Sequence, residues 1–144
     1  MIQRIQSIYL ILGVVALGAL FFFDTIWNSP AAVEHAWFAP SLTALTGFAM
    51  AVGAGAIFLY RARQRQRTVV LGAQMIVILL LVTLYGGLFM SGGFDVRQPS
   101  GYDVGRIMAL LLPIVAYVFY YLARRGIERD IQQVEDMERF RLRD

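Results

Sequence analysis

The sequence RARQRQRTVVLGAQMIVILLLVTLYGGLFM, residues 61–90, decides the fold of this chain of 144 residues. Its first seven residues include four arginines, and every residue from Thr68 to Met90 is uncharged. About 20 apolar residues suffice for a helix to cross the ~30 Å hydrocarbon core of a membrane. A guanidinium group is costly to bury in that core, so the arginines should lie at its surface. The stretch therefore predicts a membrane-spanning helix with a strongly basic end.

Three further uncharged runs, at residues 5–23, 36–60 and 107–123, are also long enough to cross a membrane. The chain is 58% hydrophobic, whereas soluble domains contain about 45–50% apolar residues. The first run ends in three phenylalanines, where a signal-peptide cleavage site would need small residues, so we expect it to be retained. We expect an all-α, four-helix transmembrane bundle over residues 1–123, with spans at about 6–23, 40–60, 68–90 and 104–123.

The remaining residues, 124–144, are of a different kind. Apolar side chains recur there at helical spacing among charged ones, at Ile127, Ile131, Val134 and Met137. This pattern predicts a charged, amphipathic cytoplasmic helix, which could continue the fourth span.

Turn-forming and helix-capping residues predict details of the loops. Ser29 followed by Pro30 suits the start of a short surface helix. The loop at residues 91–105 is rich in glycine, proline and serine, which favours an irregular conformation. Asp103 is placed to cap the fourth span. Pro113 should kink that span, because its ring nitrogen has no hydrogen to donate to the helix.

The charged residues are divided unequally between the two sides that four spans define. One side, formed by both chain ends and residues 61–67, carries eleven of the 13 arginines and six of the ten acids, a net charge of +5. The other side has a net charge of −2. Short basic loops remain in the cytoplasm during insertion. We therefore expect a multi-pass protein of a bacterial inner membrane with both termini cytoplasmic (N-in/C-in), and no nucleic-acid partner.

Residue types that commonly carry catalysis are scarce. There is no cysteine, which excludes thiol catalysis and thiolate metal sites. The charged residue nearest to the interior of a span is Arg106, whose side chain should reach the interface. The alternative is that it binds an anionic group or pairs with Asp95 or Asp103. His35 is the only histidine, too few for a zinc or b-type haem site. We therefore expect no catalytic residue, no cofactor and no metal, in a protein that is not an enzyme.

Small and polar residues within the spans indicate where helices could associate. Gln74 is expected to hydrogen-bond to Thr43, Thr46 or a backbone carbonyl of a neighbouring helix, and the alternative is that it lines a pore. A pattern typical of close helix packing in lipid occurs in the second span. It consists of small residues at intervals of four, Gly47, Ala51 and Gly55.

The arginines nearest to the spans are the best candidates for binding a partner. We expect them to fix the topology and to contact anionic lipid headgroups at the inner face, each contributing about 1 kcal/mol near the surface. They are Arg61, Arg63, Arg65, Arg67, Arg124 and Arg125.

Motifs at both ends of the chain resemble those of a known family. The chain opens with MIQRIQ (residues 1–6) and Tyr9-Leu10, and the fourth span leads into LARRGI (residues 122–127) and DMERFR (residues 136–141). With the length and span pattern of the whole chain, these motifs resemble the domain of unknown function family 4293, found chiefly in Bacteroidota and their relatives. The family tail is usually lysine-rich, whereas every basic residue here is arginine, which keeps the charge. The resemblance implies a four-span inner-membrane protein and supplies no activity, cofactor or catalytic residue.

These observations favour a non-enzymatic function. We expect a small structural or accessory component that packs with copies of itself or with other membrane proteins. The alternative is a small transporter or channel for an apolar or weakly polar solute, whose path Gln74, Thr83 and Tyr85 would line beside Pro113.

Overall fold

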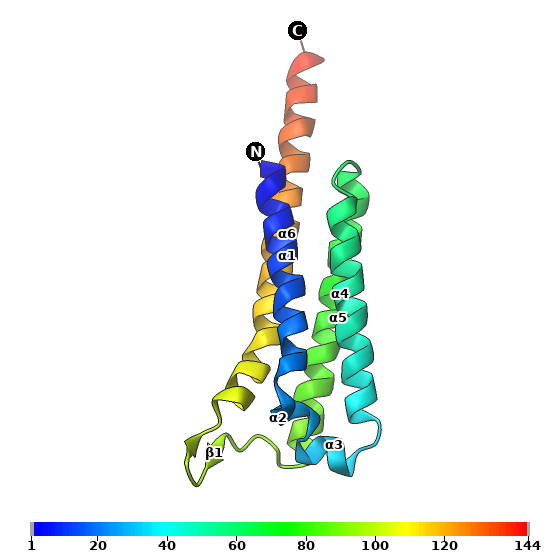
Figure 1. Cartoon of the computed structure of the whole chain (residues 1–144). Helices are drawn as coiled ribbons and strands as arrows, with labels where there is room; N and C mark the ends of the chain where they lie inside the picture. The colour runs from blue at the N-terminus through cyan, green and yellow to red at the C-terminus, as the bar shows by residue number, and fades with distance from the viewer. Residues whose placement is uncertain (1, 144) are drawn as a thin grey trace.

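The computed structural model describes residues 2–143, with side chains described for residues 5–143. Its body consists of four long helices: α1 (Ile2–Ala19), α4 (Phe38–Phe58), α5 (Arg63–Met90) and α6 (Val104–Arg141). They run side by side in alternating directions, so that both ends of the chain lie at the same end of the bundle (Figure 1). Within the described residues, four helices are long and apolar enough to cross a membrane, which confirms this part of the sequence prediction.

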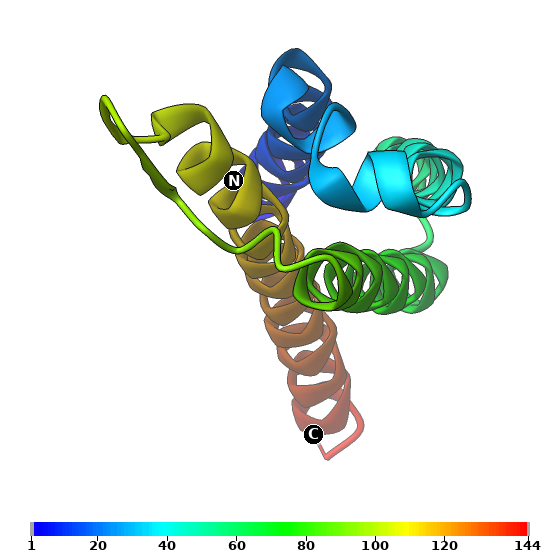
Figure 2. The ribbon, with the colours of Figure 1, turned by 90° about the horizontal axis from the view of Figure 1, so that it is seen from below.

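The helices form a ring in the order α1, α4, α5 and α6, as the view along the bundle shows (Figure 2). Side chains that face into the ring, such as Leu17 and Leu84, are fully buried. Side chains that face outward are apolar as well, and Phe48, Leu79 and Val118 are exposed. Helices that are apolar all round are typical of membrane spans, since lipid chains cover the outward face.

The side chain of Tyr120 joins three helices at the centre of the ring. It projects from α6, is fully buried, and its hydroxyl donates a hydrogen bond to the Ala49 carbonyl oxygen of α4 at 3.2 Å. Its ring fills the space beside Gly13 of α1 and Gly53 of α4, where an added Cβ would overlap ring or hydroxyl atoms. Both positions must therefore lack a side chain for the three backbones to come this close.

We predict that Gly13→Ala and Gly53→Ala each lower the free energy of unfolding by about 1–3 kcal/mol, because each added methyl group overpacks the site of Tyr120. The measurement is an unfolding titration of the purified protein in mixed micelles. Gly86→Ala is the matched control, because Gly86 is exposed and nothing lies within 4 Å of its Cβ position. Equal stability of all three variants would contradict the role given to Tyr120.

The end of the bundle opposite to the termini is built from short elements. These are η1 (Leu20–Phe22), α2 (Asp24–Trp27), α3 (Pro30–Glu34), β1 (Arg97–Gln98) and β2 (Gly101–Tyr102). The expected surface helix is confirmed as α3, with Ser29 Oγ accepting from the backbone N–H of Ala32 at 3.4 Å. The loop at residues 91–105 is irregular over most of its length, as expected, except that Arg97 pairs with Tyr102 in a short antiparallel hairpin. Gly101 has φ +129°, which a residue without Cβ adopts readily, and this allows the turn.

Asp103 and Arg106 organise the start of α6. As expected, Asp103 caps this helix, its Oδ1 accepting from the backbone N–H of Arg106 at 3.0 Å. The side chain of Arg106 is only 17% exposed, and its Nε lies 3.9 Å from Asp103 Oδ2. Its Nη1 also donates to the carbonyl oxygen of Asp95 at 2.6 Å. Arg106 therefore pairs within its own loop, which was the alternative to the interface position expected for it.

The end of the bundle that carries both termini, here called the arginine end, consists of residues 5–9, 59–67 and 122–141. The loop expected over residues 61–67 is shorter than predicted, because α5 already begins at Arg63. Arginine and glutamine are good helix formers, so the run RQRQR has no reason to stay irregular. The side-chain amide of Gln66 also donates to the Ala56 carbonyl oxygen at 3.0 Å, which ties the first turns of α5 to α4.

α6 is one continuous helix through both the fourth span and the charged segment that follows it. Pro113 lies inside it, and the ribbon of α6 changes direction along its yellow part (Figure 1). The nitrogen of Pro113 cannot donate to the carbonyl four residues earlier, that of Ala109. On the next carbonyl, that of Leu110, the hydroxyl of Tyr85 donates a hydrogen bond at 3.0 Å. This bond ties α5 to α6 close to the proline.

Candidate interaction site at the arginine end

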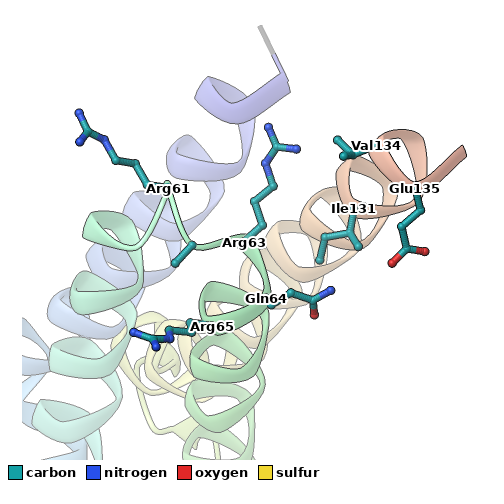
Figure 3. Close-up of a pocket in the computed structure, with 8 residues that line it drawn as sticks. Arg61, Arg63, Gln64, Arg65, Ile131, Val134 and Glu135 are labelled. Carbon is teal, nitrogen blue, oxygen red and sulfur yellow. The ribbon is translucent and has the colours of Figure 1, made fainter. Parts of the chain in front are cut away.

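A cleft of about 500 Å³ lies at the arginine end, between the start of α5 and the part of α6 that continues past the bundle. One wall consists of residues 61–65, and the other is formed by Ile131, Val134 and Glu135 of α6. Gln64 points across the cleft toward α6, whereas Arg61 and Arg65 point to the opposite side (Figure 3). The cleft thus has an apolar strip on α6 and a basic rim on the other side.

Ion pairs connect α5 to α6 next to this cleft. Arg63 Nε lies 3.0 Å from Asp130 Oδ2, whose side chain is only 13% exposed. Arg67 Nε lies 3.0 Å from Glu128 Oε1, and Arg124 Nε lies 3.6 Å from the same oxygen. Partly exposed pairs of this kind contribute up to about 1 kcal/mol each. Three of the six arginines predicted for topology and lipid contact therefore have carboxylate partners inside the chain.

The other three of these arginines have no carboxylate partner among the described residues. Arg61 lies over the ring of Tyr60, 5.6 Å from its centroid, and its Nε donates to the Tyr60 hydroxyl at 3.0 Å. Arg65 and Arg125 are exposed. The basic side chains at this end thus fall into two groups, one that holds helices together and one that is available to an anion.

The predicted packing residues Gly47, Ala51 and Gly55 lie on the outward face of α4. All three are exposed, and nothing lies within 4 Å of the Cβ position of either glycine. The close packing of α4 inside the bundle uses Gly53 instead, a residue that the sequence reasoning missed. The available signal was a second series of small residues in the same span, Ala49, Gly53 and Ala56, which proves to be the buried one.

Gln74 is buried inside the bundle, but the hydrogen bond expected for it is absent. Its side chain is almost completely buried, and neither Nε2 nor Oε1 has a partner among the described residues. The hydroxyl of Thr46 is buried and unpaired as well, and that of Thr43 donates to the Ala39 carbonyl oxygen of its own helix at 2.9 Å. The expected bond to Thr43 is wrong because Thr43 is exposed on α4 and donates to its own helix instead.

We predict that Gln74→Leu raises the free energy of unfolding by about 1 kcal/mol, because it removes a buried amide without a partner. Gln66→Leu is the matched comparison, since the amide of Gln66 donates to Ala56, and it should lower the free energy of unfolding by a similar amount. Both values come from unfolding titrations in mixed micelles. Loss of stability in Gln74→Leu would show that this amide has a partner in the membrane.

Among the described residues, no three histidine or acidic side chains lie close enough together to hold a metal ion. The described geometry at the arginine end consists of ion pairs, unpaired guanidinium groups and apolar strips.

Comparison with known proteins gives a family and no further relative. Neither the curated proteins nor the solved structures contain a match to this chain. A family model described as "Domain of unknown function (DUF4293)" matches residues 2–140, nearly the whole chain. The resemblance noted in the motifs at the two ends is thereby confirmed, and the chain belongs to the DUF4293 family.

Proposed function

We propose that this chain is a small integral protein of a bacterial inner membrane that acts by packing with membrane proteins, copies of itself included, rather than as an enzyme. The observation that carries the proposal is the outward direction of Gly47, Ala51 and Gly55 on α4. No helix of the described chain covers this strip, here called the α4 stripe.

The α4 stripe supports helix association for a physical reason. In lipid the hydrophobic effect does not drive helices together, so association depends on close backbone approach and on van der Waals contact. A neighbouring backbone could approach Gly47 and Gly55 closely, because nothing stands above their Cα atoms. Large exposed side chains on the same helix, Phe48 and Phe58, would flank such a neighbour.

The proposed orientation places both termini and the arginine end in the cytoplasm. Both chain ends share one end of the bundle (Figure 1), so any four-span insertion puts them on the same side. Eleven of the 13 arginines belong to that side, and a positive excess of this kind favours the cytoplasm. The anionic headgroups of the inner leaflet are then the nearest partners of the unpaired arginines.

We predict that the double variant Gly47→Leu/Gly55→Leu reduces self-association or partner capture in native membranes, because two leucines would block close approach of a second backbone. The measurement is the size distribution of the full chain extracted without detergent, in polymer-bounded membrane discs. Gly72→Leu/Gly86→Leu is the matched control, as both of these glycines lie on α5 with open space at their Cβ positions. An unchanged distribution for the α4 double variant would remove the α4 stripe as an interface.

The alternative proposal is a small transporter or channel for an apolar or weakly polar solute. The observation that favours it is the pair of buried, unpaired polar groups at Gln74 and Thr46. Of the other residues assigned to this path, Thr83 donates to the Leu79 carbonyl oxygen and Tyr85 to that of Leu110.

The transport alternative predicts glycerol flux into proteoliposomes that Gln74→Leu abolishes, because an apolar side chain would remove the polar group from the path. Light scattering after a glycerol jump measures the flux, and protein-free liposomes give the background. Flux that survives in Gln74→Leu, or that does not exceed the background, would count against this path.

A further inference from the structure

We propose that the groove between α1 and α6 at the arginine end is a binding site for the phosphate of an anionic phospholipid. The groove encloses about 380 Å³, and its walls include Gln6 and Tyr9 of α1 and Leu122, Arg125 and Arg129 of α6. It is separate from the cleft drawn in Figure 3, which lies between α5 and α6. The inference rests on the membrane placement proposed above and adds a ligand to it.

The first observation is the state of the two arginines in the groove. Arg125 and Arg129 are four residues apart on one helix, so they lie on the same face one turn apart. Neither forms an ion pair within the described chain, and no acidic residue lines the groove. The arginines where α5 meets α6 differ in this respect, because Asp130 and Glu128 form ion pairs with them.

The second observation is an unpaired donor in the groove wall. Gln6 is 4% exposed, and its Nε2 has no acceptor among the described residues. Its side chain lies against Gly126 of α6, where an added Cβ would come within 3.0 Å of Gln6 Cγ. An amide N–H held in this way lacks an oxygen acceptor, and a phosphate oxygen would supply one.

The nature of the ligand follows from these donors and from the depth of the groove. Guanidinium groups bind phosphate through paired N–H donors, which makes arginine well suited to this anion. Toward the centre of the bundle the walls are apolar: Leu122 belongs to the last uncharged run, and the ring of Tyr9 stacks on Phe119 with centroids 6.4 Å apart. Cationic groups above an apolar wall match a glycerophospholipid, whose phosphate adjoins its acyl chains.

The test is native mass spectrometry of the full chain, released from micelles that contain equal amounts of phosphatidylglycerol and phosphatidylcholine. We expect the wild-type chain to retain one phosphatidylglycerol in preference to phosphatidylcholine. Arg125→Gln/Arg129→Gln should lower this retention at least about fivefold, because two cationic contacts are lost. Gln6→Leu, which changes no charge, should lower it at least about twofold.

The matched control is Arg61→Gln/Arg65→Gln, which removes the same charge from exposed arginines at the same end of the bundle. This variant should retain phosphatidylglycerol with a loss of less than about twofold. A lipid that stays bound depends on the groups that contact it, and distant exposed charges are largely screened. Equal losses in the two double variants, or no preference for phosphatidylglycerol, would overturn the proposal. Unchanged retention in Gln6→Leu would remove Gln6 from the site.

A second arm separates a lipid headgroup from free phosphate. In phosphatidylcholine micelles, millimolar sodium phosphate should leave the thermal unfolding of the wild-type chain unchanged. If phosphate raised the unfolding temperature of the wild-type chain but not that of Arg125→Gln/Arg129→Gln, the ligand would be the free anion and the lipid assignment would be overturned. Bound lipid is measured on the monomeric chain, so this result does not depend on whether the α4 stripe is an interface. A monomeric chain that keeps its lipid would contradict only the proposed association.

Discussion

Close approach of backbones around Tyr120 is the constraint on which the bundle depends. Lipid chains solvate apolar helix surfaces as well as other helices do, so a membrane bundle needs contacts that lipid cannot supply. Here one ring fits between Gly13 of α1 and Gly53 of α4, and its hydroxyl binds the Ala49 carbonyl oxygen. Side-chain hydrogen bonds at two other helix contacts fix the relative axial positions of the helices. Gln66 joins α5 to α4, and Tyr85 joins α5 to α6.

Charge is used in two ways at the arginine end. Arg63 and Arg67 of α5 form ion pairs with carboxylates of α6, and these pairs join the two helices. Toward α1, Arg125 and Arg129 meet no carboxylate within the described chain, and the groove they line stays cationic. The sequence does not distinguish the paired arginines from the unpaired ones. It indicates on which side of a membrane an arginine lies, but not which side chain it contacts.

The four helices were predictable because span length and the absence of charge are properties of the chain itself. Their facing sides were not, since a helix that is apolar all round has no polar face to mark its outside. α4 contains two series of small residues, and the sequence alone does not show which of them is buried. Gly53 is buried because the side chain of Tyr120 packs against it, whereas nothing lies within 4 Å of the Cβ position of Gly47. The candidate site was predictable in composition but not in pairing. Six arginines were expected at one surface, but the sequence does not show that Arg63 and Arg67 of α5 pair with acids of α6, or that Arg124 pairs with Glu128 one turn along its own helix.

The length of α6 has a consequence for anything that contacts its last turns. With 38 residues at about 1.5 Å each, it measures about 57 Å, roughly twice the ~30 Å hydrocarbon core of a bilayer. The excess is helix rather than flexible linker, so it projects from the bundle as a rigid rod. A molecule that held Phe140 or Arg141 would therefore be kept at a fixed distance from the bundle.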